Sequence, residues 1–239
     1  PSYISGSGTY TIGNNNGTAS APIAATESGA FGNNNAMPVS TTSGIRIVGN
    51  GNSVSSNNAM VMGNNVTVGA GLDGAVVLGN NSSANATVAT NSATVNNITY
   101  SGFAGSNPAA GNVVSVGTAG SERQIQNVAA GRISATSTDA VNGSQLYVTN
   151  NVVGNVASSA KTVLGGNASV GTDGKITMNN IGGTGKGNVN DAIKAANTQV
   201  LRGTNVASVV KTTGTDGQSV YTVNADGTTV SGAGAVKVT

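Results

Sequence analysis

The residues best suited to chemistry lie close together in the segment GSERQIQNVAAGR, residues 120–132. Glu122 and Arg123 stand side by side there, and Arg132 follows nine residues later, in a chain of which only 8% of the residues are charged. A carboxylate beside guanidinium groups can serve proton transfer at an active site, or it can form structural ion pairs and hydrogen bonds. The composition of the whole chain bears on which of these two uses applies.

That composition argues against an enzyme. The chain has no His and no Cys, which removes the usual general base, most nucleophile dyads and the commonest transition-metal ligands. Four of the eight acidic residues lie in Asp-Gly pairs, which are first of all turn signals: Asp73, Asp173, Asp216 and Asp226. We therefore expect no catalytic residues, no metal site and no cofactor.

Motifs for other ligands are also incomplete. GGTGKG, residues 182–187, resembles a phosphate-binding loop, but Lys186 is followed by Gly187 where Ser or Thr is required, and Asn180 stands where the spacing needs Gly. The glycine-rich turns lack the regular Asp of calcium-binding repeats. Ten basic residues against eight acidic ones, a net charge of +2, are too dilute for a nucleic-acid surface.

A recurrent apolar–Gly–Asn pattern organises the first 120 residues. Asn follows the glycine in five of its six occurrences, and the middle glycines are 17, 14 and 16 residues apart. Such an interval holds two short strands with a tight turn after each, which predicts a β-solenoid or β-roll. The apolar–Gly pairs are Ile12–Gly13, Phe31–Gly32, Val48–Gly49, Met62–Gly63, Leu78–Gly79 and Val116–Gly117.

Each position of this repeat has an expected role. Gly and Asn tolerate positive φ, so they mark the corners of the coils. We expect the apolar residue before each glycine to stack in the core above its equivalent in the next coil, and the asparagines to form a ladder of side-chain amides. Low-complexity disorder is the alternative, but the apolar positions keep their phase with glycine. Residues 81–112 break the repeat and predict an insertion loop.

The segment SVGTAGSERQIQNVAAGRISATSTDAVNGSQLY, residues 115–147, resembles the neck of trimeric autotransporter adhesins, the YadA-like surface proteins of Gram-negative bacteria. The resemblance implies a mainly β fold: a left-handed parallel β-roll head over residues 1–114, trimeric, and then the neck. A short helical coiled segment, residues 148–160, and a small β-rich (α+β) trimeric module, residues 161–239, would follow.

The resemblance gives the charged cluster a structural use. Where a roll narrows to a coiled stalk near a three-fold axis, backbone groups lose their sheet partners, and polar side chains can supply hydrogen bonds and interchain ion pairs. A solvated surface pair is the alternative. We expect the trimer contacts of the neck to be Glu122, Arg123, Gln124, Asn127, Arg132, Asp139, Asn142, Gln145 and Leu146.

A helix is expected to open within STDAVNGSQLY, capped by Ser137 or Thr138, with Asp139 at its positive end. Two apolar stripes are alternatives for the side by which this helix contacts its neighbours, and the residues do not settle the heptad register. The stripes are Val141, Val148, Val152 and Val156, or Leu146, Val153 and Ala160. Because Gly154 and repeated asparagines weaken this helix, packing in a trimer would have to sustain it.

Residues 161–239 are expected to contain two short strands joined at Asp173–Gly174, a short helix capped by Asn190 and a hairpin turning at Asp216–Gly217, with a second turn at Asp226–Gly227. This region resembles the connector and prism-like modules of the same adhesins, of the Trp-ring, GIN and FGG types. The absence of Trp fits a strict Trp-ring poorly.

For function, the resemblance implies a homotrimer on the bacterial cell surface, anchored in the outer membrane through a C-terminal region not present here. It would attach to matrix proteins of the collagen-like, fibronectin or laminin class, to cells or to abiotic surfaces, through many weak contacts that add as avidity. No nucleic-acid partner is expected, and no residue specifies the ligand. The alternative is a purely structural spacer of the adhesin fibre.

Overall fold

The computed structural model describes residues 1–227. The chain divides into two compact units, Pro1–Tyr147 and Val148–Thr239. The first unit is built on a parallel β-roll, and the second combines antiparallel hairpins with two helices, the first of which begins in the first unit. The prediction of a mainly β chain with a β-roll is therefore confirmed.

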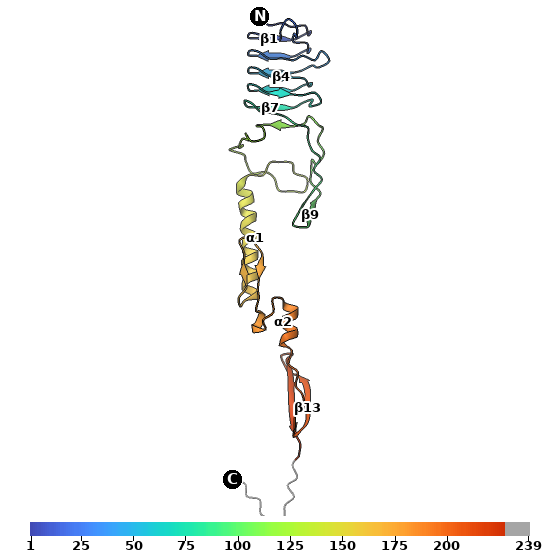
Figure 1. Cartoon of the computed structure of the whole chain (residues 1–239), viewed down its shortest axis with the longest axis vertical. Helices are drawn as coiled ribbons and strands as arrows, with labels where there is room; N and C mark the ends of the chain where they lie inside the picture. The colour runs from blue at the N-terminus through green and yellow to red at the C-terminus, as the bar shows by residue number, and fades with distance from the viewer. Residues whose placement is uncertain (228–239) are drawn as a thin grey trace, which may run out of the picture. The chain divides into compact units, whose positions relative to one another are not determined.

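One wall of the roll is a six-stranded parallel sheet in the order β1-β2-β3-β5-β7-β10, to which each coil contributes one strand (Figure 1). Its strands are only two or three residues long, shorter than the interval of the repeat suggested. Their bounds are Tyr10–Ile12 (β1), Gly29–Phe31 (β2), Arg46–Val48 (β3), Met60–Met62 (β5), Val76–Leu78 (β7) and Val114–Ser115 (β10).

The opposite wall is less regular. Strands β4 (Ser53–Val54) and β6 (Thr67–Val68) pair in parallel, and isolated bridges from Ala36 to Ser53 and from Thr67 to Ser83 extend the ladder by one coil in each direction. The interior between the walls is thin and filled by small or branched side chains. Those fully enclosed include Met37, Ile47, Val54, Val61, Val68 and Val77.

The core assignment made from the repeat is wrong for the single chain. The residues before the glycines do stack in register, from Ile12 through Phe31 and Val48 to Met62 and beyond, but they stand on the outside, 49–57% exposed in these four cases. Alternate residues of a strand face opposite sides, and the narrow interior accepts the middle residue of each strand instead. The larger side chains are therefore left on the outer face.

The corner glycines are required for two reasons. Gly13, Gly32 and Gly49 have φ values of 127°, 135° and 139°, which side-chain-bearing residues rarely adopt. In addition, a Cβ atom on each would collide with the carbonyl oxygen of the equivalent glycine in the next coil. Gly79, with φ 97°, shares the left-handed conformation expected of a corner, whereas Gly63 and Gly117 lie outside it.

The asparagines form two ladders, not the single one expected. In the outer ladder, Asn33, Asn50 and Asn64 each donate from the backbone N–H and from Nδ2 to the Oδ1 of the asparagine in the following coil, at 2.8–3.1 Å. Asn14 begins this ladder and Asn80 ends it. The residue between the two ladders turns the chain with φ near 56°, as at Asn34 and Asn65.

The inner ladder is buried and consists of Asn16, Asn35 and Asn52, each at most 1% exposed. The Nδ2 of Asn35 donates to the Oδ1 of Asn16 at 3.0 Å and to the carbonyl of Gly49 at 2.8 Å. Its Oδ1 accepts the backbone N–H and the Nδ2 of Asn52. The GNNN sequence thus supplies, in order, a corner, an outer rung, a left-handed turn and an inner rung.

The predicted insertion lies between β7 and β10, which pair directly with each other. It contains an antiparallel hairpin that the sequence had suggested only as a loop: β8 (Ser92–Val95) and β9 (Ile98–Ser101) (Figure 1). Asn96 and Asn97 form its turn with φ values of 50° and 62°, as a two-residue hairpin turn requires.

Helix α1 (Gly143–Leu164) begins later than predicted. Its cap is Asn142, whose Oδ1 accepts the backbone N–H of Gln145 at 3.3 Å, so the assignment of Ser137 or Thr138 as the cap is wrong. Asp139 instead accepts hydrogen bonds from Arg132. Within α1 no residue is buried in the single chain.

The second unit contains β11 (Ser169–Val170) and β12 (Ile176–Thr177), the 3-10 turn η1 (Ile181–Gly183), α2 (Val189–Ala196) and the hairpin β13 (Val206–Thr213) and β14 (Ser219–Ala225). Both hairpins turn at the predicted Asp-Gly pairs. The cap of α2 is Asn188, not Asn190. The residues after the expected turn at Asp226–Gly227 lie outside the described part.

Candidate functional site

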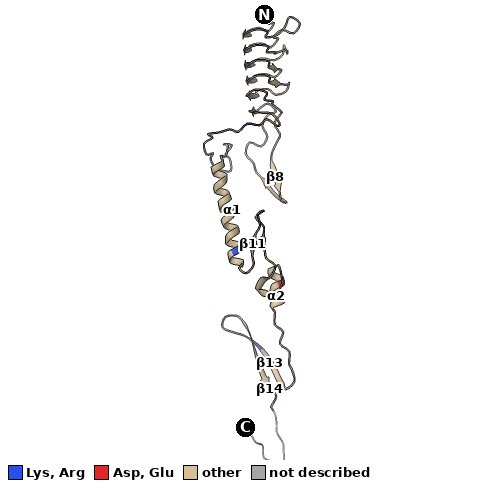
Figure 2. Ribbon diagram, turned by 60° about the vertical axis from the view of Figure 1, so that its left-hand side comes forward, with Lys and Arg blue, Asp and Glu red and all other residues tan. Residues whose placement is uncertain are grey.

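The outer face of the six-stranded sheet is a stack of exposed apolar side chains. Five of the six strands contribute exposed side chains to it, those of β7 are half-buried, and Arg46 is its one charged residue. The exposed fractions of its large apolar members lie between 48% and 68%: Tyr10, Ile12, Phe31, Val48, Met60, Met62 and Val114. Figure 2 shows that the roll contains almost no other Lys, Arg, Asp or Glu. Repeated apolar groups of this size on one face indicate an interaction surface.

The β8–β9 hairpin is amphipathic. Residues that face each other across an antiparallel pair lie on one side, so the register places Tyr100 and Ala93 on the same side as Val95 and Ile98. The other side carries hydroxyls, and the Oγ1 atoms of Thr94 and Thr99 lie 3.0 Å apart. One apolar face and one polar face are therefore presented by only eight strand residues.

The apolar face of this hairpin is open in the single chain. Val95, Ile98 and Tyr100 are 52–58% exposed, and residues 74–121 contain no charged side chain. Hydrogen bonds from Thr87 to Ala110 and from Thr90 to Ser106 hold only its base. Since a two-stranded hairpin is marginally stable alone, this element is suited to contact another molecule.

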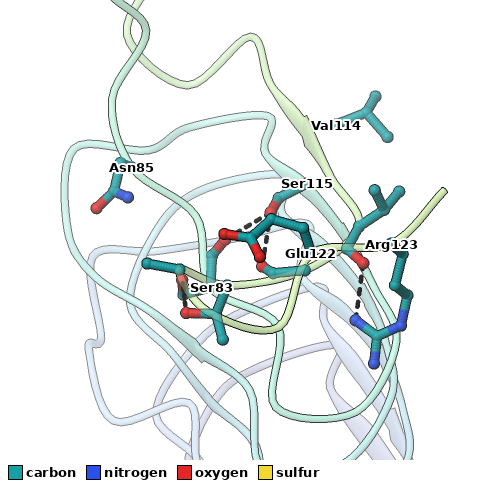
Figure 3. Close-up of a pocket in the computed structure, with 10 residues that line it drawn as sticks. Ser83, Asn85, Val114, Ser115, Glu122 and Arg123 are labelled. Carbon is teal, nitrogen blue, oxygen red and sulfur yellow. Dashed lines mark hydrogen bonds between the residues drawn. The ribbon is translucent and has the colours of Figure 1, made fainter.

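Arg123 closes the last coil of the roll. Its Nη1 donates to the carbonyl of Val116 at 2.7 Å (Figure 3) and to Oγ of Ser82 at 2.9 Å, and its Nη2 donates to the carbonyl of Asn80 at 2.9 Å. The guanidinium also covers Gly79, where a Cβ would collide with it. Arg123 thus supplies hydrogen bonds to backbone carbonyls at the end of the roll, where no further coil provides donors.

Glu122 is not paired with Arg123. Its Oε1 accepts the backbone N–H of Gly120 at 2.9 Å, and this hydrogen bond lowers the pKa of the carboxyl group. Both residues line a pocket of about 380 Å³ together with the hydroxyls of Ser83, Ser115 and Thr118 (Figure 3). These hydroxyls are hydrogen-bonded within the roll, so the pocket offers polar contacts but no hydroxyl activated by a base.

Two other predicted neck residues, Asn142 and Gln145, hold the beginning of α1 against the segment at residues 128–131. Gln145 exchanges two hydrogen bonds with the backbone of Gly131, at 2.7 and 2.9 Å, and Asn142 donates to the carbonyl of Val128 at 3.1 Å. The predicted residues Gln124, Asn127 and Leu146 are exposed, and Asn127 turns the chain with φ 60°. The interchain contacts assigned to the neck remain a prediction.

Arg132 and Asp139 form a bidentate ion pair within the chain, with Nε to Oδ2 at 2.8 Å and Nη2 to Oδ1 at 3.2 Å. The hydrogen bonds from Arg132 lower the pKa of Asp139, and the carboxylate raises that of Arg132. Both side chains are exposed, so the pair fixes the local conformation and adds little to stability.

Substituting Arg123 tests its closing role. Arg123→Ala is expected to lower the free energy of unfolding by about 2 kcal/mol, because three hydrogen bonds from a charged donor are lost at a partly solvated site. Arg123→Lys should recover less than half of this loss, since a single ammonium cannot serve the three acceptors. Urea unfolding followed by circular dichroism measures both variants, with Ser134→Ala, at an exposed position outside the predicted trimer contacts, as control. An unchanged midpoint for Arg123→Ala would contradict the role.

Comparison with known proteins places these features in a family context. Residues 124–169 match the family model described as the coiled stalk of trimeric autotransporter adhesin. The trimeric autotransporter adhesin AtaA of Acinetobacter sp. (strain Tol 5) is 42% identical over 120 residues, which are 47% of this chain and 3% of that protein. The autotransporter adhesin BtaE of Brucella suis biovar 1 (strain 1330) is 56% identical over 70 residues, which are 29% of this chain and 9% of that protein.

The resemblance inferred from the neck is confirmed by these matches, which are to adhesins and not to enzymes. The chain spans less than a tenth of the length of the curated relatives it matches. The solved C-terminal YadA-like domain of a Burkholderia pseudomallei protein is 32% identical and covers 64% of this chain and 52% of that one, with a TM-score of 0.37. Among residues 1–227, no helix has the length and apolarity needed to span a bilayer.

Proposed function

We propose that this chain is part of an adhesin on the surface of a Gram-negative bacterium, in which three identical chains associate and attach the cell to matrix proteins, other cells or abiotic surfaces. The observation that carries the proposal is the apolar outer face of the six-stranded sheet, in a chain similar to trimeric autotransporter adhesins. Such a stack exposes too much apolar surface for an isolated chain in water.

Helix α1 supports association by a second route. It has 22 residues, none of them buried, and includes Gly154 and several asparagines. A helix of this composition is marginal in water on its own. The exposed side chains of Val148, Val152 and Val156 recur at four-residue intervals, which is the arrangement by which helices of neighbouring chains pack.

We assign the adhesive contact of this segment to the apolar face of the β8–β9 hairpin. The roll uses none of these side chains in its interior, and the absence of charge over residues 74–121 suits the contact to apolar or neutral ligand surfaces. Three chains would present three copies. Weak contacts of each hairpin would then add as avidity, which multiplies the strength of attachment without any new contact.

Replacing three side chains of this face tests the assignment. The combined variant Val95→Ser, Ile98→Ser, Tyr100→Ser is expected to lower adhesion at least about tenfold while leaving the oligomer intact, because loss of three weak contacts removes most of the avidity. The control is Thr94→Ser, Thr99→Ser on the polar face. Binding is measured on collagen, fibronectin, laminin, cultured cells and polystyrene.

Two results would contradict the proposal in different ways. Equal adhesion of the apolar-face variant and the control would remove the hairpin from the contact. A wild-type chain that forms trimers but binds nothing on this panel would favour the alternative function, a structural spacer within a longer fibre.

A further inference from the structure

Residues 1–72 carry only two charged side chains, Glu27 and Arg46. Both are exposed, and they lie at corresponding ends of two adjacent coils. Glu27 lies two residues before β2, and Arg46 is the first residue of β3, paired in the ladder with Gly29. Two opposite charges are thus placed together in an otherwise uncharged part of the chain.

The guanidinium of Arg46 is held at the level of the preceding coil. Its Nη1 donates to the carbonyl of Glu27 and to that of Ile45, both at 2.8 Å. It occupies the position of the sheet that Tyr10, Met60 and Val76 fill in other coils. Arg46 is therefore a fixed cation at the rim of an apolar stack.

The carboxylate of Glu27 is not paired with Arg46 within the chain. Its Cγ lies 3.5 Å from the position that a Cβ of Gly8 would take, so the side chain packs beside the first coil. Within residues 1–227 the ion pairs are Arg132–Asp139 and Lys175–Asp173, which leaves both Glu27 and Arg46 without an opposite charge in the single chain.

We propose that Arg46 of one chain pairs with Glu27 of a neighbouring chain, an inference that rests on the trimer proposed above. When the outer face of one chain packs against its neighbour, Arg46 loses water, and an unpaired charge there is strongly unfavourable. A ring of three identical chains joins two different patches at each interface, so one chain can offer the cation and the next the carboxylate. Because each guanidinium lies at the height of Glu27, chains at equal height bring the two groups together.

The pair would set the alignment of the chains. The stack from Ile12 to Leu78 repeats similar apolar groups in every coil, so a neighbour shifted by one coil finds nearly the same surface. One charge pair breaks this equivalence, as a single polar position fixes the register of a coiled coil. A shifted neighbour would leave both charges buried and unpaired.

Charge reversal in the whole chain tests this. Glu27→Arg and Arg46→Glu are each expected to raise the dissociation constant of the trimer at least about tenfold, since like charges then meet at every interface. When the two variants are unfolded together and refolded, opposite charges meet again between unlike chains. Native mass spectrometry should then show mixed trimers more often than random mixing gives. Thr67→Glu, on the other wall of the roll, is the control and should mix at random.

The outcomes separate this inference from the trimer itself. A wild-type chain that is monomeric at micromolar concentration overturns both. A wild-type trimer whose reversal variants dissociate no more readily overturns the pair alone. Weakened variants that mix at random also overturn it, because a pair confined to one chain gains nothing from a different neighbour.

Discussion

Asn35→Ala is expected to lower the free energy of unfolding of the roll by about 3 kcal/mol, although it removes a single uncharged side chain. Asn35 is 1% exposed and connects three coils. Without its amide, the carbonyl of Gly49 and the N–H of Asn52 lose their hydrogen bonds inside the protein, and each buried group left unpaired costs about 1–3 kcal/mol. Water cannot replace the amide at an enclosed position.

The matched control is Asn33→Ala in the outer ladder. Asn33 makes the same kind of hydrogen bonds to Asn14 and Asn50, but it is exposed, so water takes over and the expected loss is below about 1 kcal/mol. Urea unfolding followed by circular dichroism compares the two. Equal losses of unfolding free energy would show that the buried ladder stabilises the roll no more than the exposed one.

Met62→Asp is expected to dissociate the trimer while the roll of each chain stays folded. Met62 is 56% exposed on the outer face and contributes nothing to the interior. Placed in an interface between chains, an unpaired carboxylate costs about 3–5 kcal/mol, which corresponds to a hundredfold or greater rise in the dissociation constant. Size-exclusion chromatography with light scattering gives the mass, and circular dichroism checks the fold.

Thr67→Asp is the control for this experiment. Thr67 is exposed on β6, in the opposite wall, where an added carboxylate remains in water. This variant should keep the mass of the wild type. If both variants remain trimeric, the outer face is not the contact between chains.

The roll was predictable because its rules are local. A glycine with φ above 120° at Gly13, Gly32 and Gly49 and an amide rung in every coil leave a direct mark on the sequence, namely the GNNN repeat. Which residues of a strand face the interior of the roll cannot be read from the sequence in the same way. Both the middle and the flanking residues of short strands such as MVM and VVL are apolar, so the alternation that separates inside from outside is absent.

At both helices the cap lies at another residue than the one predicted. Ser137 and Thr138 are good capping residues, and Asp139 suits a positive helix end, but in the folded chain Asp139 is engaged by Arg132 and the cap falls at Asn142. Only tertiary hydrogen bonds from the neck decide between such candidates. At α2 the choice between Asn188 and Asn190 is local, because the side chain of Asn188 accepts the N–H of Asp191 three residues on.

The β8–β9 hairpin was missed although its signal is present. SATV and ITYS alternate polar and apolar residues on either side of Asn96–Asn97, which is a hairpin pattern. The absence of the Gly–Asn repeat over residues 81–112 predicts that the roll is interrupted there, but it does not specify what structure takes its place. The residues with which we propose the chain adheres lie in this segment.

Sedimentation equilibrium of the 239-residue chain over a range of micromolar concentrations tests the central claim most directly. Three chains associated through the outer face predict the mass of a trimer at every concentration in this range. A monomer mass, with the circular dichroism of a folded β-roll and its apolar outer face still in water, would contradict it.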